Sequence, residues 1–502
     1  MTPMMQQYLN IKEQNPDCIL FFRLGDFYEM FFEDAKLASK DLDIVLTSKS
    51  CGEDSGAPMC GVPYHSAQAY IARLIEKGHK VAICEQVEDP KLAKGLVDRQ
   101  VVRVISSGTV TDSTMLSDKE NNFLCAIHRG DKNCGVCFCD ISTGQVFATY
   151  MSGSSIGTQI SSEMSRFAPK EVLLNDKMYK DKTFCDFLKV KFSCVVSQYD
   201  GLTQNDATAF VDGQFGAKYV ETNGFYDKIE TVYALGALMR YLKDTQKTDL
   251  SYINNLQFYV QGKYMDLDSQ AIRNLELCQS IQTHEKKGSL LWVLDKTKTS
   301  MGGRLLKQWL LHPLMDVLAI NKRQTAVAEL LEKSVPRKEI EFLLKDVLDI
   351  ERLIGRVVFG SANCRDLKAM EQTAHALPPI KNELSVFESN LLKELFGAMD
   401  DLEEIKTLVS AAIVDDPPFS VREGGMIKKG FDPEIDQLLE VRENGKNIIT
   451  AIEAAERERT GIKNLKIGFN KVFGYYIEVT KSYFDLVPDT YIRKQTDRKS
   501  VV

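Results

Sequence analysis

The sequence has little of what hydrolytic enzymes and membrane proteins need. Its 502 residues include six histidines, none of which forms a His-x-x-x-His pair or lies beside an obvious nucleophile. No run approaches the roughly 20 apolar residues of a membrane span. The N-terminus also lacks the basic segment and apolar stretch of a secretory signal. These absences predict a cytoplasmic protein without hydrolytic catalysis.

A nucleotide-binding P-loop is missing as well. Such a loop has the pattern Gly-x4-Gly-Lys-Ser/Thr, because backbone N–H groups wrap the phosphates while the lysine reaches them. The nearest string, Gly425-Met-Ile-Lys-Lys-Gly430, continues with Phe431 and Asp432 and fails at both decisive positions. We therefore predict that the chain as given is not an enzyme, does not hydrolyse ATP and needs no cofactor.

Twelve cysteines without a secretory signal are predicted to be reduced thiols rather than disulfides. The tightest cluster, Cys134, Cys137 and Cys139 with Cys125 upstream, superficially resembles a metal knuckle. No second Cys or His pair follows it at the spacing of a zinc site. Alternation along a β-hairpin explains the cluster better, so we predict no metal there.

The length exceeds one hydrophobic core, so several domains are expected, and 44% apolar residues can supply each of them. The net charge of −7 argues against a protein that coats nucleic acid indiscriminately. A local stretch has the opposite balance, with Lys463, Lys466, Lys471, Lys481, Arg493, Lys494, Arg498 and Lys499 against Glu478, Asp485, Asp489 and Asp497. It is a candidate for contact with DNA phosphates, although a solvated basic face has the same composition.

The first 115 residues alternate helical and strand patterns, which is typical of a small α/β domain. Thr2 and Pro3 form an N-cap and N1 pair for a first helix that should end near Asn15. The elements expected after it are a strand at 18–23, a turn at 25–26, a helix at 32–42, a strand at 44–47, a helix between Ser66 and Gly78, and a strand at 81–84.

The remaining chain divides into three further regions. Residues 123–128, 135–141 and 146–150 have the pattern of a three-stranded β-meander, followed by helices to about residue 250. Residues 268–414 are dominated by segments with a 3.6-residue period, which predicts a long helical body. A polar helix at 432–459 then leads to a β-hairpin formed by residues 465–469 and 475–480.

One short pattern, Phe-x-Glu, puts an aromatic ring and a carboxylate on the same side of an extended segment. It occurs at Phe27-Tyr28-Glu29 and again at Phe31-Phe32-Glu33. Phe31 and Phe32 coincide with the start of a helix pattern and are predicted to be core residues. Phe27 follows a turn, where a side chain can project outward, but the pattern alone favours a core position for Phe27 too.

Long strings of residues decide between these readings, and they run in order from about residue 2 to Thr496. The strings in the first domain are Phe22-Arg-Leu-Gly-Asp-Phe-Tyr-Glu-Met-Phe31, Met59-Cys-Gly-Val-Pro-Tyr-His65 and Val81-Ala-Ile-Cys-Glu-Gln86. The later strings include Arg273-Asn-Leu-Glu276, Thr299-Ser-Met-Gly-Gly-Arg304, Asp349-Ile-Glu-Arg-Leu353, Glu456-Arg-Glu-Arg-Thr-Gly461, Phe469-Asn-Lys-Val-Phe-Gly-Tyr-Tyr-Ile477 and Tyr491-Ile-Arg-Lys-Gln-Thr496. Together they resemble the MutS family of bacterial mismatch-repair proteins.

The resemblance implies α/β N-terminal domains followed by a mainly α-helical lever and core domain with a β-hairpin clamp. The domains it implies are a mixed-sheet mismatch-binding domain at 1–115, an RNase H-like connector at 116–250, a helical core and lever domain at 251–433, and a clamp domain at 434–502. Members of the family encircle double-stranded DNA with mispairs or small loops as homodimers, and a MutL-type partner is expected. Their further C-terminal domain binds ATP and Mg²⁺, and they work in the bacterial cytoplasm, at the nucleoid when bound to DNA.

This sequence departs from the family after Thr496, where members continue into a helix that returns from the clamp and then into the ATPase domain. Residues 497–502 do not follow that pattern, so we expect them to differ from the native family sequence. Much of the family's dimer contact lies in the later region, so the resemblance leaves dimerisation of this chain open.

The resemblance also assigns roles to individual residues. Phe27 would be a wedge that enters a poorly stacked mispair, where a duplex kinks more cheaply, and Glu29 would hydrogen-bond the same base, with a protonated carboxyl donating to a ring nitrogen. Four further residues of the clamp, chosen for their polarity and their place in that domain rather than by a motif, would contact phosphates without reading sequence. They are Asn470, Lys471, Arg493 and Lys494.

Two alternatives come from other functional classes. An RNase H-like nuclease would need several carboxylates around Mg²⁺, and the meander offers Asp131 and Asp140 without further acids in a recognisable site. A relative that acts on recombination intermediates or structured DNA would share the fold. Glu29 beside Phe27 in an intact first domain favours mismatch recognition over this second alternative.

Overall fold

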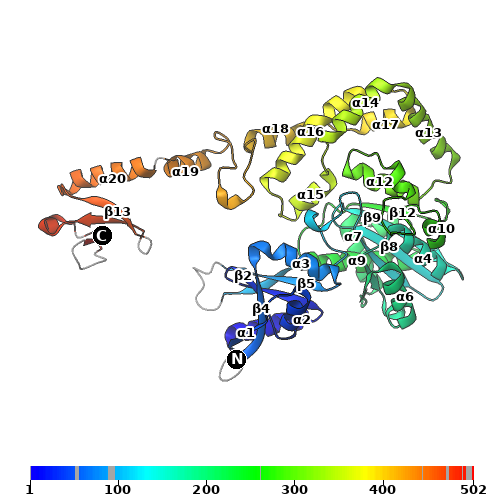
Figure 1. Ribbon diagram of the computed structural model, residues 1–502, viewed down its shortest axis with the longest axis horizontal. Coiled ribbons are helices and arrows are strands. Elements are labelled where there is room, and N and C mark those ends of the chain that lie inside the picture. The colour runs from blue at the N-terminus through cyan, green and yellow to red at the C-terminus, as the bar shows by residue number, and fades with distance from the viewer. Residues whose placement is uncertain are drawn as a thin grey trace. The chain divides into compact units, whose positions relative to one another are not determined.

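The computed structural model describes residues 2–50, 56–88, 97–260, 262–443, 445–470, 474–488, 490–492 and 500–501. They fall into two compact units, Met1–Lys406 and Thr407–Val502. Figure 1 colours the chain from blue at the N-terminus to red at the C-terminus and labels its elements. Within the described ranges, every helix is too short or too polar to cross a bilayer.

The first unit begins with a mixed six-stranded sheet in the order β3-β4-β2-β1-β5-β6, in which β1 and β5 are parallel and the other neighbours antiparallel. Side chains alternate along β1, so Ile19 and Phe21 join a core with α2 and α3, whereas Leu20 and Phe22 join a core with α1. The elements are α1 (Pro3–Gln14), β1 (Cys18–Leu24), β2 (Phe27–Phe31), α2 (Phe32–Leu42), β3 (Thr47–Ser50), β4 (Gly56–Pro63), η1 (Tyr64–Ser66), α3 (Ala67–Glu76), β5 (Lys80–Gln86), β6 (Arg99–Ile105) and η2 (Ser113–Met115).

Most of the elements expected in this domain are confirmed. The first helix starts at Pro3, and α2 covers the expected 32–42. The strand expected at 44–47 is wrong, because β3 begins only at Thr47. Asp43 ends α2 in the left-handed conformation, with φ of 56°, and Val45 and Leu46 then run exposed to solvent without a strand partner. The apolar residues at 44–46 therefore belong to the connection between α2 and the edge strand β3.

A second six-stranded sheet follows, in the order β11-β10-β7-β8-β9-β12. The expected meander is confirmed as the antiparallel strands β7, β8 and β9, and β10, β11 and β12 join parallel to their neighbours. The elements are β7 (Phe123–Arg129), β8 (Asn133–Asp140), β9 (Gln145–Ser152), α4 (Ile156–Phe167), β10 (Glu171–Leu174), α5 (Asp176–Tyr179), α6 (Lys182–Phe192), β11 (Val195–Gln198), α7 (Gln204–Phe215), α8 (Tyr219–Thr222), α9 (Ile229–Gln246) and β12 (Asn255–Tyr259).

Helix α9 packs very closely on β8. A Cβ at Gly135 would lie 2.2 Å from the backbone oxygen of Glu230, so only glycine permits this approach.

The cysteine cluster belongs to the same sheet. Cys134 faces one core of the domain while Cys137 and Cys139 face the other, and no group of metal-binding side chains occurs among the described residues. The alternating positions follow from the strand, as the sequence predicted.

The helical body expected at 268–414 is confirmed. In the first unit its elements are α10 (Ser269–Asn274), α11 (Leu290–Leu294), α12 (Ser300–Leu311), α13 (Val317–Glu332), α14 (Ser334–Leu343), η3 (Leu344–Asp346), α15 (Ile350–Val358), α16 (Cys364–Leu384) and α17 (Asn390–Ala398). Arg304 of α12 is buried and binds Asp349 and Glu351 at 2.6 Å each, while it donates to the backbone oxygen of Asp118 at 2.9 Å. This charged cluster joins the helical body to the segment before β7.

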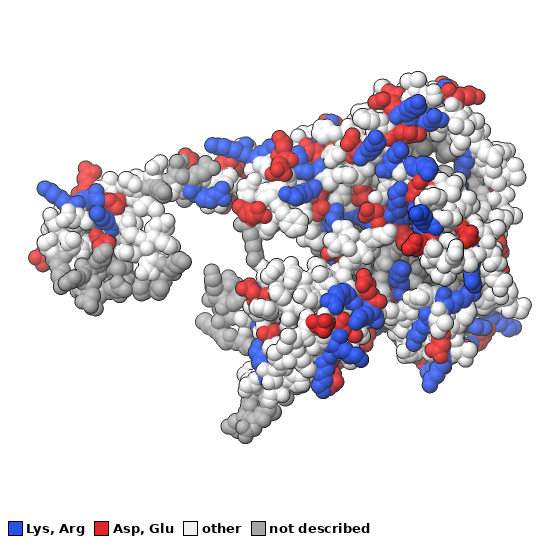
Figure 2. Space-filling view, viewed as in Figure 1, with Lys and Arg blue, Asp and Glu red and all other residues white. Residues whose placement is uncertain are grey.

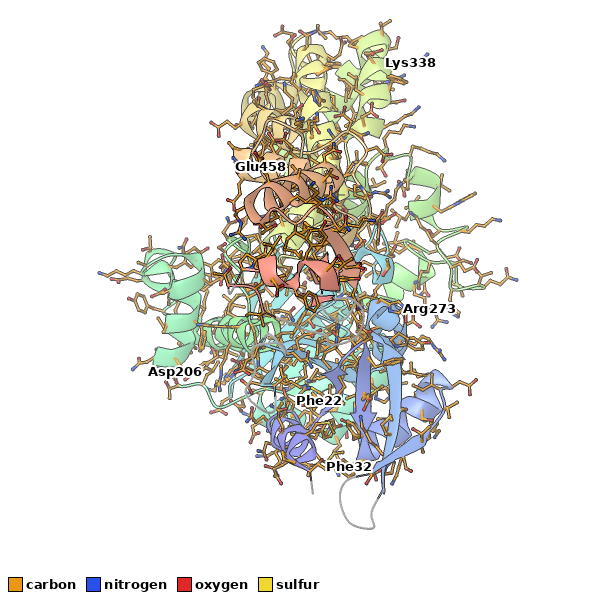
Figure 3. The ribbon with its side chains drawn as sticks, turned by 90° about the vertical axis from the view of Figure 1, so that its left-hand side faces the viewer. Phe22, Phe32, Asp206, Arg273, Lys338 and Glu458 are labelled. Atoms are coloured by element: carbon orange, nitrogen blue, oxygen red, sulfur yellow. The ribbon has the colours of Figure 1, made fainter. Side chains whose placement is uncertain are left out.

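The second unit contains the expected polar helix and hairpin. Its core consists of Ile462, Leu465 and Val479, and the side chain of Glu453 accepts a hydrogen bond of 2.9 Å from the backbone of Ile467 in the hairpin. Figure 3 labels Glu458 on α20. The elements are the end of α18 (Glu403–Ala412), η4 (Val421–Glu423), α19 (Pro433–Glu443), α20 (Gly445–Thr460), β13 (Lys466–Asn470), β14 (Gly474–Val479), η5 (Lys481–Leu486) and β15 (Ser500–Val501).

Candidate nucleic-acid interface

The Phe-x-Glu motif lies at the turn end of the antiparallel pair β1 and β2. Gly25 has a φ of 57°, which a glycine adopts without strain, and it lets the chain reverse so that Leu24 pairs with Phe27. The backbone N–H of Tyr64 donates a hydrogen bond of 3.0 Å to the carbonyl oxygen of Asp26. The turn that presents Phe27 is therefore held by the first residue of η1, which directly follows the neighbouring strand β4.

Phe27 is exposed, with 48% of its surface accessible to solvent. The core position that the short pattern favoured for Phe27 is therefore wrong. Phe31 is fully buried, as expected for a core residue, and Phe32 is half-buried at the first position of α2. Phe27 therefore presents about half of its surface to solvent at the start of β2.

Phe27 is exposed while Phe31 is buried because helix α1 covers only one end of this face of the sheet. Phe27, Glu29 and Phe31 share one face of β2, because alternate residues of a strand point the same way. At one end of this face the ring of Tyr8 in α1 packs against Phe31, with ring centroids 5.0 Å apart. Phe27 lies at the other end, so the face passes from covered to open along five residues. Phe22, labelled in Figure 3, lies opposite Glu29 on β1 and is fully buried.

Glu29 forms an ion pair on this open face. The Nζ atom of Lys49, on β3, lies 2.5 Å from Glu29 Oε2, and the side chains of Lys49 and Glu29 are 35% and 16% exposed. Gly61 lies directly across from Glu29 on β4, and a Cβ there would lie only 3.5 Å from Glu29 Cγ. The carboxylate is thus partly buried, charge-paired and adjacent to the exposed ring of Phe27.

A polar cluster supports the opposite face of β2. Tyr28 donates a hydrogen bond to Glu85, and Arg23 lies 3.6 Å from the same carboxylate. Burial, followed by the hydrogen bond to Glu85, raises the pKa of Tyr28. The guanidinium of Arg23 also stacks 3.7 Å above the ring of Tyr64. These contacts fix the segment that carries Phe27 and Glu29.

Of the four clamp residues expected to contact phosphates, the structure describes Asn470. Asn470 is exposed at the end of β13, next to the turn of the hairpin. Lys471, Arg493 and Lys494 lie outside the described residues. Lys463 and Lys466 are exposed at the same hairpin. The described part of the basic segment thus has cationic and polar side chains in solvent, which a phosphate backbone could contact.

The hairpin also carries two exposed aromatic rings that the sequence analysis did not single out. Phe469 and Tyr475 pair across β13 and β14, are 62% and 64% exposed, and have ring centroids 5.0 Å apart.

Figure 2 shows lysine and arginine interspersed with aspartate and glutamate over the face that it draws. This mixture agrees with a net charge of −7 and with contact to nucleic acid through local sites.

Asp131 and Asp140, the two carboxylates that an RNase H-like nuclease would use, differ in burial and lie at opposite ends of β8. Asp140 is fully buried at the end of β8, where Asn121, Asn122 and Ser142 donate hydrogen bonds to it. Asp131 precedes the start of the same strand and forms an exposed ion pair with Lys177 at 2.7 Å. Side chains at opposite ends of one strand cannot share a metal ion, so this alternative has no support in the described residues.

Sequence reasoning missed Lys49, which follows Glu29 by 20 residues without a shared motif. The signal that connects them is tertiary, because β3 joins the sheet through β4 rather than next to β2. A lysine on an edge strand is also common protection against aggregation, so the residue type alone does not single out Lys49.

The succession of two sheet domains, a helical body and a hairpin unit, with an exposed phenylalanine beside a paired carboxylate, defines a modular protein of several domains. Three consecutive models of one family match the chain: MutS domain I at residues 2–114, MutS domain II at 122–254 and MutS domain III at 270–483. The chain belongs to the MutS family and carries its domains I, II and III.

Similar proteins extend along almost the whole chain. The DNA mismatch repair protein MutS of Ruminiclostridium cellulolyticum is 50% identical over 500 residues, which are 99% of this chain. Its namesakes in Acetivibrio thermocellus and Alkaliphilus oremlandii are 49% and 47% identical, also over 99% of this chain. The chain spans 57% of the length of each of these relatives.

Proposed function

We propose that this chain recognises mispaired or looped double-stranded DNA and bends it by inserting Phe27 at the defect. The single observation that carries the proposal is the exposed ring of Phe27 at a fixed turn beside Glu29. The family membership supports it, because domain I is the part of the chain in which both residues lie.

The mechanism follows from the mechanics of a defective duplex. A mispair stacks poorly, so kinking costs less there than in matched DNA, and an apolar wedge can enter between base steps. An aromatic ring that stacks on a base contributes about 1 to 3 kcal/mol. Phe27 supplies that stacking without reading the sequence, and Glu29 hydrogen-bonds the displaced base.

Contacts to the phosphate backbone would come from the hairpin unit. Asn470, Lys471, Arg493 and Lys494 are the proposed contacts, and only Asn470 lies among the described residues. Such contacts position a protein on DNA without specifying sequence, and they weaken as salt concentration rises. We further propose homodimerisation, a MutL-type partner and a cytoplasmic location, and that ATP and Mg²⁺ act on the longer relatives rather than on this chain.

The test is a comparison of binding curves at one fixed salt concentration. Labelled duplexes with one unpaired thymine, with a G·T mispair, and with full complementarity are titrated with the purified chain, and a four-way junction serves as a further arm. The proposal expects tighter binding to the first two than to the matched duplex. Equal affinity for all duplexes, or a preference for the junction alone, would contradict it.

A further inference from the structure

The ion pair between Lys49 and Glu29 places a cation where the proposed DNA contact has an acid. Lys49 Nζ approaches Glu29 Oε2 at 2.5 Å, and the ammonium lies 5.7 Å from the centre of the Phe31 ring. The three side chains share one face of the sheet with Phe27, since Lys49 pairs with Ala57 and Glu29 with Gly61 on the intervening strand. Lys49 thus reaches across β4 to the carboxylate.

An unpaired carboxylate at this position would oppose DNA binding. Duplex DNA carries one negative charge per about 1.7 Å of its axis, so an anionic side chain beside the wedge would be repelled as the duplex approaches. The partial burial of Glu29 strengthens the interaction with its partner, because less water screens the charges. A fixed cation within bonding distance removes the repulsion before DNA arrives.

The pairing also leaves one oxygen of the Glu29 carboxylate for a further hydrogen bond. An ionised carboxylate only accepts hydrogen bonds, whereas a protonated one also donates. The bond from Lys49 uses Oε2, and among the described residues Oε1 takes part in no hydrogen bond. Oε1 therefore remains for an N–H group of a base, such as the ring N3–H of an unpaired thymine.

We propose that Lys49 is a positioning residue for Glu29, whose carboxylate it orients as a hydrogen-bond acceptor for the displaced base. This inference rests on the proposed function. It differs from the expectation that a protonated Glu29 donates to a ring nitrogen. A purely structural role for Lys49 would instead be to fasten the edge strand β3 to the sheet.

The experiment compares five variants for binding to a duplex with one unpaired thymine and to the matched duplex. Lys49→Met removes the cation, and Lys49→Arg keeps it. Glu29→Gln removes the acid, and Lys49→Met is also made in the Glu29→Gln background. Lys36→Met is the matched control, because it deletes an equal charge from an exposed pair with Glu33 on α2 of the same domain.

We expect Lys49→Met to reduce the preference for the unpaired thymine roughly fivefold, the effect of one partly exposed ion pair. Lys49→Arg and Lys36→Met should keep the preference. In the Glu29→Gln background the change at Lys49 should have no further effect, since its target is gone. A fastening role would instead lower the melting temperature of Lys49→Met and weaken binding to both duplexes alike.

Three results would overturn the inference. The first is an unchanged preference in Lys49→Met. The second is an equal loss of affinity for both duplexes, which would make Lys49 a phosphate contact only. The third is an additive effect of Lys49→Met and Glu29→Gln in the double variant. If the unmodified chain shows no preference for the unpaired thymine, the proposed function itself fails and takes this inference with it. The unmodified arm therefore separates the two failures.

Discussion

Phe27 and Phe22 lie on neighbouring strands and on the same face of one sheet, yet one is half exposed and the other fully buried. The alternation of residues predicts the face but not its cover, because the cover depends on where α1 crosses the sheet. The pattern Phe-x-Glu alone therefore favoured a core position for Phe27, whereas the preceding turn allowed an exposed one and the family resemblance implied it. The pairing of Glu29 with Lys49 could not be predicted from the sequence either, because β4 lies between β3 and β2 in the sheet.

Substitution of the two phenylalanines should separate these environments. Phe22→Ala leaves a cavity in a packed core and should cost about 3 to 5 kcal/mol of stability. Phe27→Ala loses little packing and should leave the melting temperature nearly unchanged. Thermal unfolding of both variants checks this, and a large destabilisation by Phe27→Ala would show that its ring is structural.

His312 should make the stability of the first unit depend on pH. Burial lowers the pKa of His312 from 6.5 to about 4, and its Nδ1 lies 3.0 Å from the backbone oxygen of Gln308. The unfolded chain therefore binds a proton at higher pH than the folded chain does. The stabilising effect of a neutral His312 is complete above pH 6.5 and declines as the pH falls towards 4, by about 3 kcal/mol in all.

The measurement is the difference in unfolding free energy between the unmodified chain and His312→Gln, at pH 7 and at pH 4.5. The variant should lose less stability on acidification, because glutamine does not titrate. His284→Gln, at an exposed position, is the control and should follow the unmodified chain. Identical acid sensitivity in all three proteins would contradict the assignment.

At the scale of elements, periodicity predicted well what local residues determine. The helix α2, the meander β7 to β9 and the hairpin β13 to β14 lie close to the expected residues, because alternation and turn residues are both local signals. The strand at 44–47 failed because Val45 and Leu46 are apolar but exposed. An apolar run indicates a strand only when another element covers it.

Local stability should differ strongly between two helices. Twelve residues of α9 are buried, whereas none of the described side chains between residues 433 and 461, which span α19 and α20, is buried. Amides of α19 should therefore exchange about 100-fold faster with solvent than those of α9, because local opening exposes little apolar surface. Hydrogen exchange followed by mass spectrometry tests this, and equal protection of α19 and α9 would refute it.

At the scale of the whole chain, composition indicated several domains, and the net charge of −7 turned attention from overall charge to local sites. The order of sheet domains, helical body and hairpin could be read from the sequence because each region has its own periodicity. The predicted domain boundaries at 115, 250 and 433 stay predictions, since an exact boundary depends on contacts such as those of Arg304 with Asp349 and Glu351.

Nucleotide chemistry is expected to be absent from this chain. The sequence contains no Gly-x4-Gly-Lys-Ser/Thr string, so no loop of that kind can wrap a triphosphate. We predict no ATP turnover and no saturable nucleotide binding by the purified chain. Stoichiometric binding that depends on Mg²⁺ would refute the prediction.

The central claim is that the exposed ring of Phe27 confers preference for a defect in DNA, and Phe27→Ala tests it most directly. Affinities of this variant for a duplex with one unpaired thymine and for the matched duplex are measured at one salt concentration, beside those of the unmodified chain. Loss of stacking worth about 1 to 3 kcal/mol should bring the two affinities of the variant together, while weak binding through phosphates remains. A stably folded Phe27→Ala variant that keeps its full preference would contradict the account.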